Sequence, residues 1–255
     1  PDDPAELILS GPHFFVGDPF YKTPRRACSL NSHYDVLDHA RLPDDYLPRS
    51  NYMPACGEEE YAARIPTVPW DGRPVTDFYR LVSRKMIGPS SERTLQSAIA
   101  PKNVAHIHAV FSITFLDTKA LVGQTGAYLS LPFDFFVKTT SKSNFLFDIA
   151  GLLPLIDSEP WFTLMAARTL SLNCLTVHYV PLWEELWDDA FARDSWTSAD
   201  PRLDRDFFAR LTPKWSWSCA LRADMARRQA LVEIDVLAAL ALGMTLDELL
   251  SIYRV

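Results

Sequence analysis

The chain has 255 residues, 48% of them hydrophobic and 12% aromatic, so it is long enough to bury a sizeable core and belongs among globular proteins. It shows neither an apolar run of membrane-spanning length nor a secretory signal, and its four separated cysteines form no Cys-x-x-Cys pair. We therefore expect no membrane partner, no metal knuckle and a cytoplasmic location, and the net charge of −7 argues against a simple nucleic-acid binder.

The first third of the sequence predicts one strand, a long loop and one helix. The apolar run Leu7–Val16 favours a strand that enters a turn at Gly17-Asp18-Pro19. Six prolines between Arg41 and Pro74 exclude a long helix or a central strand, so this stretch is expected to be a loop. Apolar residues at helical spacing predict a helix over Val75–Ile87 that Gly88-Pro89 stops.

Two strands are expected next, over Thr94–Ala100 and Ala105–Phe115. In the second, polar and apolar residues alternate, which is typical of a half-buried antiparallel sheet. This alternation predicts that His106 and His108 share one polar face. The glycines of Gly123–Gly126 are expected to form a turn.

The last hundred residues have a helical character. We predict helices over Trp161–Leu175, Pro181–Phe191 and Ala223–Leu242, followed by a capping box that begins at Thr245. The predicted fold is therefore α+β, with a small, largely antiparallel sheet in a mixed α/β domain (residues 1–156) and an all-helical domain after it (residues 157–255). Both chain ends look cut, which suggests a fragment of a longer enzyme.

Charge is distributed unevenly along the chain. Residues 73–142 hold nine Lys or Arg against four Asp or Glu, a net charge of +5. Residues from 157 onward hold ten against fifteen, a net charge of −5. This segregation indicates that the first region faces an anion, although ordinary surface variation would give the same pattern.

The stretch from Leu129 to Ile156 carries a family resemblance. A short amphipathic helix that contains Leu131 and Phe135 leads into a polar loop with two lysines, and an apolar run ends in Leu-Pro-Leu-Ile. This order resembles the end of a target recognition domain in adenine-specific DNA methyltransferases of the fused restriction–modification or phage-defence type. The departures are Pro132 inside the helix and the absence of a second proline at the end.

A second stretch, from Gly11 to Arg26, resembles the opening of the same recognition domain. It contains Asp18-Pro-Phe-Tyr, which lacks one proline of the family's Asn/Asp-Pro-Pro-Tyr/Phe motif, where an aromatic ring stacks on a flipped base. No Gly-rich cofactor turn precedes it. We therefore assign no catalytic residue. The alternative to a catalytic role is that this motif is a turn after a strand.

The resemblance and the charge pattern together nominate DNA-binding residues. Cations suit phosphates, Lys also suits guanine edges, and Asn pairs with adenine. A polar strand face with two histidines suits a groove-reading surface, although plain solvent exposure explains it equally well. The nominated residues are Lys22, Arg25, Arg26, His106, His108, Lys138, Lys142 and Asn144.

The function implied by the resemblance is DNA sequence recognition for an N6-adenine methyltransferase. Double-stranded DNA and a methyltransferase domain elsewhere in the parent chain would be the partners. S-adenosylmethionine is expected in the parent and no cofactor in this chain, which alone is not expected to be catalytic. Two alternatives are a protein–protein docking module whose acidic helical surface includes Glu184, Glu185, Asp188 and Asp189, and a small-molecule enzyme that uses His106 and His108.

Overall fold

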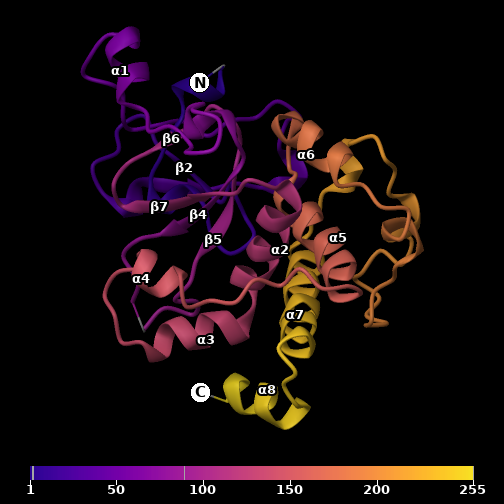
Figure 1. The fold of residues 1–255 in the computed structure, drawn as a ribbon. Coiled ribbons are helices and arrows are strands. Elements are labelled where there is room, and N and C mark those ends of the chain that lie inside the picture. The colour runs from indigo at the N-terminus through magenta and orange to yellow at the C-terminus, as the bar shows by residue number, and fades with distance from the viewer. Residues whose placement is uncertain (2, 89, 255) are drawn as a thin grey trace.

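The computed structural model describes residues 1, 3–88 and 90–254, and its architecture is α+β, as predicted. Small sheets occupy one side of the molecule, and helices α2, α5 and α7 pack beside them (Figure 1). Helices α3 and α4 lie below the sheets, whereas α8 projects at the end of the chain (Figure 1). The described helices are α1 Glu58–Arg64, α2 Thr118–Leu129, α3 Leu131–Thr139, α4 Phe147–Ala150, α5 Trp161–Asn173, α6 Val180–Glu185, α7 Asp224–Ala241 and α8 Leu246–Tyr253.

The sheets are mostly antiparallel, as expected. A three-stranded antiparallel sheet has the order β5-β4-β7, with β4 (Arg80–Arg84) in the centre between β5 (Ser97–Ala100) and β7 (Val110–Thr114). An antiparallel hairpin joins β2 (Lys22–Pro24) to β3 (Tyr34–Val36). The remaining pair, β1 (Ile8–Leu9) with β6 (Ala105–His106), is parallel.

The sequence predicted the long helices of the second half well. Helices α5 and α7 lie within the expected ranges, and the capping box at Thr245 is present. The expected helix over Pro181–Phe191 ends early, because α6 stops at Glu185. The proline-rich stretch Arg41–Pro74 is largely irregular but holds the short helix α1.

The glycines expected to turn the chain at 123–126 lie instead inside α2. A methyl group at Gly126 would sit 2.5 Å from the Met165 side chain, and one at Gly123 would sit 2.5 Å from the Ile156 carbonyl oxygen. These glycines therefore permit the close approach of α2 to α5, which a larger residue would block. The prediction of a turn was wrong because the sequence does not distinguish glycine used for packing from glycine used for bending.

The α-helix predicted over Val75–Ile87 was also wrong, because this stretch holds a short 3-10 turn (Val75–Asp77) followed by the central strand β4. Its residues are buried on both faces, so the polar–apolar alternation that marks a strand is missing. Arg80 is only 2% exposed and donates to the Val104 carbonyl oxygen, which hides a charged residue inside the sheet. The expected helix stop at Pro89 lies outside the described residues.

The single strand predicted over Ala105–Phe115 is two strands. Chain segment 107–109 separates β6 from β7, and these strands belong to different sheets. His106 therefore ends β6, whereas His108 lies in the connecting turn. The two histidines do not share one strand face, because the regular alternation of the sequence continues through a turn that it does not reveal.

One hydrophobic cluster contains residues from both halves of the chain. Leu81 and Ile99 of the sheet belong to the same cluster as Trp183 of α6 and Ile234 of α7, all at most 1% exposed. Trp183 is thus a core residue. The domain boundary at residue 156 stays a prediction.

Helix α7 buries two acidic side chains, those of Glu233 and Asp235. Glu233 is 5% exposed and accepts a hydrogen bond from Arg168 at 2.6 Å, and Asp235 is 1% exposed and accepts one from the Leu131 amide at 2.6 Å. Arg168 also donates to Asp194 at 2.5 Å. Buried charges require such partners. The partners of Glu233 and Asp235 are distant in sequence, so the sequence alone does not reveal them.

Asp18 of the Asp-Pro-Phe-Tyr motif is likewise internal. Its carboxylate accepts a hydrogen bond from the Phe20 amide at 3.1 Å and lies 3.2 Å from His39 and 3.9 Å from the Arg227 guanidinium. Phe20, which stands in place of the family's second proline, is fully buried, and the ring of Tyr21, at the motif's aromatic position, lies 5.2 Å from the Phe15 ring. The motif forms a turn, which is the alternative to a catalytic role given above.

Asp18 should make stability depend on acid. Burial acts to raise the pKa of Asp18, but Arg227 and His39 outweigh it and hold the pKa below its ordinary value of 3.8. As pH falls, the unfolded chain takes up the proton first, so the carboxylate's contribution is lost below about pH 4. In urea unfolding, Asp18→Asn should be less stable than the parent at pH 6, and the difference should shrink below about pH 4. A difference that stays constant with pH would contradict this assignment.

Candidate nucleic-acid interface

Three chain segments run side by side beyond the end of β4. The Lys85 amide donates to the Ala109 carbonyl oxygen at 3.0 Å on one side. On the other side, the Phe145 amide donates to the Lys85 carbonyl oxygen at 2.7 Å, and Met86 bridges to Asn144. We call the side chains that these segments present, Lys85, His108, Lys142 and Asn144, the basic edge.

The side chains of the basic edge are accessible. Lys85 contacts the His108 imidazole through its ammonium group, and His108 is exposed. Lys142 lies 3.7 Å from the Asp148 carboxylate, and both side chains are 59% exposed. Because exposed ion pairs contribute little, an incoming phosphate can displace Asp148 at small cost. Within the described residues, the Asn144 side-chain amide donates to the neighbouring Ser143 hydroxyl, at 3.3 Å.

Lys138 and His106 are close in sequence to residues of the basic edge but are not part of it. Lys138 is half-buried in the last turn of α3, just before the loop that carries Lys142. His106 is part-buried, and its Nε2 lies 2.8 Å from the Ser112 hydroxyl. Burial lowers the pKa of His106, so its ring is neutral at pH 7 and brings no charge to a phosphate.

The β2–β3 hairpin carries the remaining nominated cations. Arg25 forms an exposed ion pair with Asp35 across the hairpin at 2.8 Å, which lowers the pKa of Asp35. Arg26 is exposed at the end of the strand, and no described carboxylate pairs with it. The Lys22 ammonium group lies 4.8 Å from the centre of the Tyr21 ring. Lys22 and Arg26 are therefore the hairpin cations that are available to an anion.

Aromatic contacts connect this hairpin to the basic edge. The Tyr21 ring lies 5.2 Å from the Phe15 ring, and the Arg84 guanidinium lies 5.7 Å from the centre of the Phe15 ring. Arg84 precedes Lys85 and donates to the carbonyl oxygens of Gly11 and Phe14. These contacts join the stretch 11–26 to the end of β4, next to Lys85 of the basic edge.

The +5 window overstates the charge that reaches this surface. Three arginines of this window have internal partners. Arg80 and Arg84 donate hydrogen bonds to backbone carbonyl oxygens, and Arg93 pairs with the buried Asp235. Sequence counting cannot separate such internal arginines from surface lysines. The sequence analysis also did not nominate Lys85, because it assigned Val75–Ile87 to a helix and so gave no reason to place Lys85 beside the loop of Lys142 and Asn144.

The remaining candidate chemistries find less support in the geometry. The described residues contain no group of three His, Cys, Asp or Glu that could hold a metal ion. The four acids expected on one helix face are divided, because α6 ends before Asp188 and Asp189. No helix in the described part of the chain is long and apolar enough to cross a bilayer.

Comparison with known protein families, with curated proteins and with solved structures finds no match to this chain.

Proposed function

We propose that this chain binds duplex DNA through the basic edge and the adjoining hairpin. The observation that carries the proposal is that segments 85–87, 107–109 and 142–145 adjoin and present two lysines, a histidine and an asparagine. Cations of this kind position a phosphate backbone, and the amide of Asn144 can serve a base edge. Lys22 and Arg26 extend the surface to the hairpin.

The resemblance gives this surface a biological role. In that role the chain is the target recognition part of an adenine-specific DNA methyltransferase of a restriction–modification or phage-defence system. It holds a short site while a methyltransferase domain elsewhere in the parent modifies a flipped adenine. S-adenosylmethionine then belongs to that other domain.

Removing the two lysines of the basic edge should weaken duplex binding. The double variant Lys85→Ala/Lys142→Ala loses two surface cations, so the slope of log K against log salt should become shallower by up to about two units. Fluorescence anisotropy with a labelled duplex at several salt concentrations measures both quantities. Because Lys142 is exposed and Lys85 is only half-buried, the melting temperature should stay close to that of the parent.

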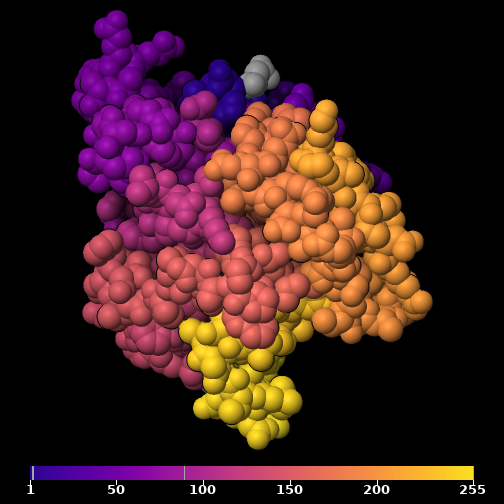
Figure 2. Space-filling view, turned by 45° about the vertical axis from the view of Figure 1, so that its right-hand side comes forward, coloured from indigo at the N-terminus to yellow at the C-terminus, as the bar shows by residue number. Residues whose placement is uncertain are grey.

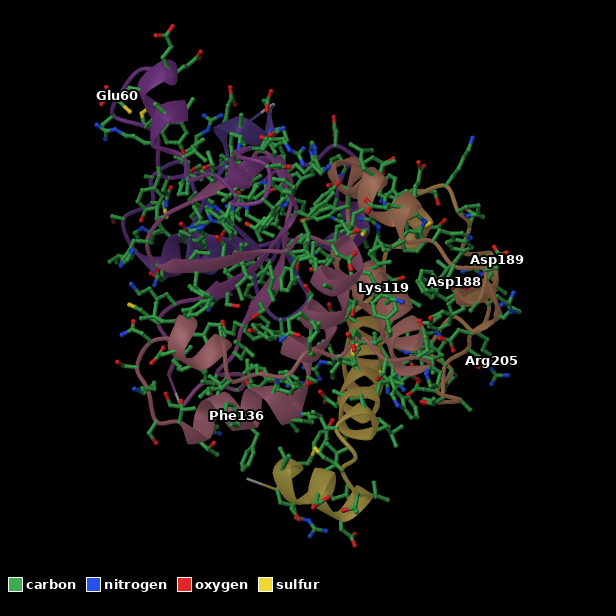
Figure 3. The ribbon with its side chains drawn as sticks, viewed as in Figure 1. Glu60, Lys119, Phe136, Asp188, Asp189 and Arg205 are labelled. Atoms are coloured by element: carbon green, nitrogen blue, oxygen red, sulfur yellow. The ribbon has the colours of Figure 1, made fainter. Side chains whose placement is uncertain are left out.

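Lys119→Ala is the matched control. Figure 3 shows Lys119 on the helical side of the molecule, away from the loop that joins α3 to α4, and its ammonium group lies 3.4 Å from Glu159. This variant should leave both affinity and slope unchanged. An equal loss in the control and the double variant would indicate a nonspecific effect of net charge and would count against the basic edge.

The docking alternative has weaker support. Asp188 and Asp189 point into solvent in Figure 3, but their carboxylates accept local hydrogen bonds from the Ala190 amide at 2.7 Å and the Trp187 indole at 3.0 Å. They therefore stabilise a turn. Binding to a basic protein that weakens with salt, with no affinity for DNA, would favour this alternative.

A further inference from the structure

A cavity, separate from the basic edge, lies where residues 73–79 and 115–121 meet the end of α6. It has a volume of about 380 Å³, within the range of small-molecule pockets. In the space-filling view, these N-terminal and middle segments meet α6 on the visible face (Figure 2). We call it the bipolar cavity, and it is lined by Arg73, Phe78, Tyr79, Lys102, Phe115, Leu116, Asp117, Thr118, Leu121 and Glu185.

The cations of the bipolar cavity come from two joined segments. The Asn103 amide donates to the Thr76 carbonyl oxygen at 2.6 Å, which holds the segment of Lys102 beside that of Arg73. The Arg73 guanidinium lies 4.4 Å from the centre of the Phe78 ring, and the Lys102 ammonium group lies 5.1 Å from that of Tyr79. Among the described residues, Asp71 bonds Arg73 through Nε, and neither terminal nitrogen of Arg73 has a partner.

The acids come from two helix ends. Asp117 caps α2 by accepting from the Lys119 amide at 2.9 Å, and Glu185 accepts from the Thr118 hydroxyl at 2.5 Å. One oxygen of each carboxylate is used in this way, and no described group bonds to the other. Lys119 does not neutralise them, because its ammonium group lies over the Phe162 ring at 4.5 Å and near Glu159.

We infer that the bipolar cavity binds a free α-amino acid with an apolar side chain. Two cations and two carboxylates line the cavity, so its lining is neutral overall and favours a ligand that carries both charges. The ligand carboxylate would face Arg73 and Lys102, and the ammonium group would face Asp117 and Glu185. Phe78 and Phe115 are half-buried and offer an aromatic surface to the side chain.

A neutral lining also separates this cavity from the DNA surface. A phosphate backbone would meet Asp117 and Glu185 as well as the cations, and these carboxylates would repel it. A zwitterion of a dozen non-hydrogen atoms should bind such an open cavity with a dissociation constant on the order of 1 mM. The inference does not depend on the proposed DNA function.

The test is an NMR titration of the chain with L-phenylalanine, 3-phenylpropionate and phenethylamine. The last two probes have the same ring but lack the ammonium group and the carboxylate, respectively. Phenylalanine should shift the signals of cavity residues and saturate, and each analogue should bind roughly tenfold more weakly, the effect of one charge-assisted contact. No saturation by phenylalanine up to about 20 mM, or equal binding of all three probes, would overturn the inference.

Two variants test which cavity residues bind the carboxylate and the ammonium group of the ligand. Lys102→Ala should weaken phenylalanine roughly tenfold and bring it to the level of phenethylamine, whereas Glu185→Gln should bring it to the level of 3-phenylpropionate. Both side chains are exposed, so unchanged melting curves should accompany these losses. Lys142→Ala, on the basic edge, should bind phenylalanine as the parent does. If the cavity variants bind like the parent, the ligand sits elsewhere and the inference fails.

Discussion

Arg168→Ala should lower the free energy of unfolding by about 3–5 kcal/mol, the largest single-residue effect that we expect. The Arg168 side chain is 4% exposed and lies between two carboxylates, those of Glu233 and Asp194. Removing it would leave Glu233 buried on α7 with only the hydrogen bonds from Thr197 and Gln229 to offset its charge. Chemical denaturation with urea at pH 7 measures the loss.

Arg202→Ala is the matched control for this loss. Arg202 also pairs with a carboxylate, that of Asp200 at 2.6 Å, but its side chain is 69% exposed. Exposed pairs contribute at most about 1 kcal/mol, so this variant should be nearly as stable as the parent. Similar losses in the two arginine variants would show that burial of the Arg168 network is not what stabilises the packing of α5 on α7.

Ile234→Ala should cost about 2–5 kcal/mol of unfolding free energy. Ile234 lies on α7, is fully buried and belongs to the main hydrophobic cluster. The substitution removes three carbon atoms and leaves a cavity that the packed helices α2 and α5 can close only in part. Thermal and urea unfolding of the purified variant would measure the cost.

Val236→Ala on the same helix provides the comparison. Val236 is 42% exposed, so its truncation should change stability by no more than about 0.5 kcal/mol. If Ile234→Ala instead melted like the parent but lost sequence preference on DNA, α7 would be a recognition element and its structural assignment would be wrong.

The long helices were predictable because their signals are local. A buried stripe at helical spacing and the capping residues of Thr245–Glu248 are both visible within a short window of sequence. The same logic failed for β4, whose central position buries both faces and whose Arg80 finds its partner in another segment. A strand of that kind carries no periodic signal that separates it from a helix.

The candidate site was predictable only in pieces. Lys142 and Asn144 were nominated from the loop composition, and His108 from a strand that proved to be a turn. Lys85, which lies between their segments, could not be identified, since its position depends on backbone pairing of residues 85–87 with residues 109 and 143–145. Long-range pairing of this kind has no signature in a single sequence. The bipolar cavity escaped prediction for the same reason, because its walls come from distant segments.

Duplex binding by the unaltered chain as a function of salt concentration tests the DNA assignment most directly. If Lys22, Arg26, Lys85 and Lys142 each contact a phosphate, log K should fall linearly with log salt, with a slope of about −3 to −4. Such a slope, measured on a chain whose net charge is −7, would require a localised cationic surface. A flat salt dependence, or no binding at low ionic strength, would contradict the assignment of the basic edge as a DNA-binding surface.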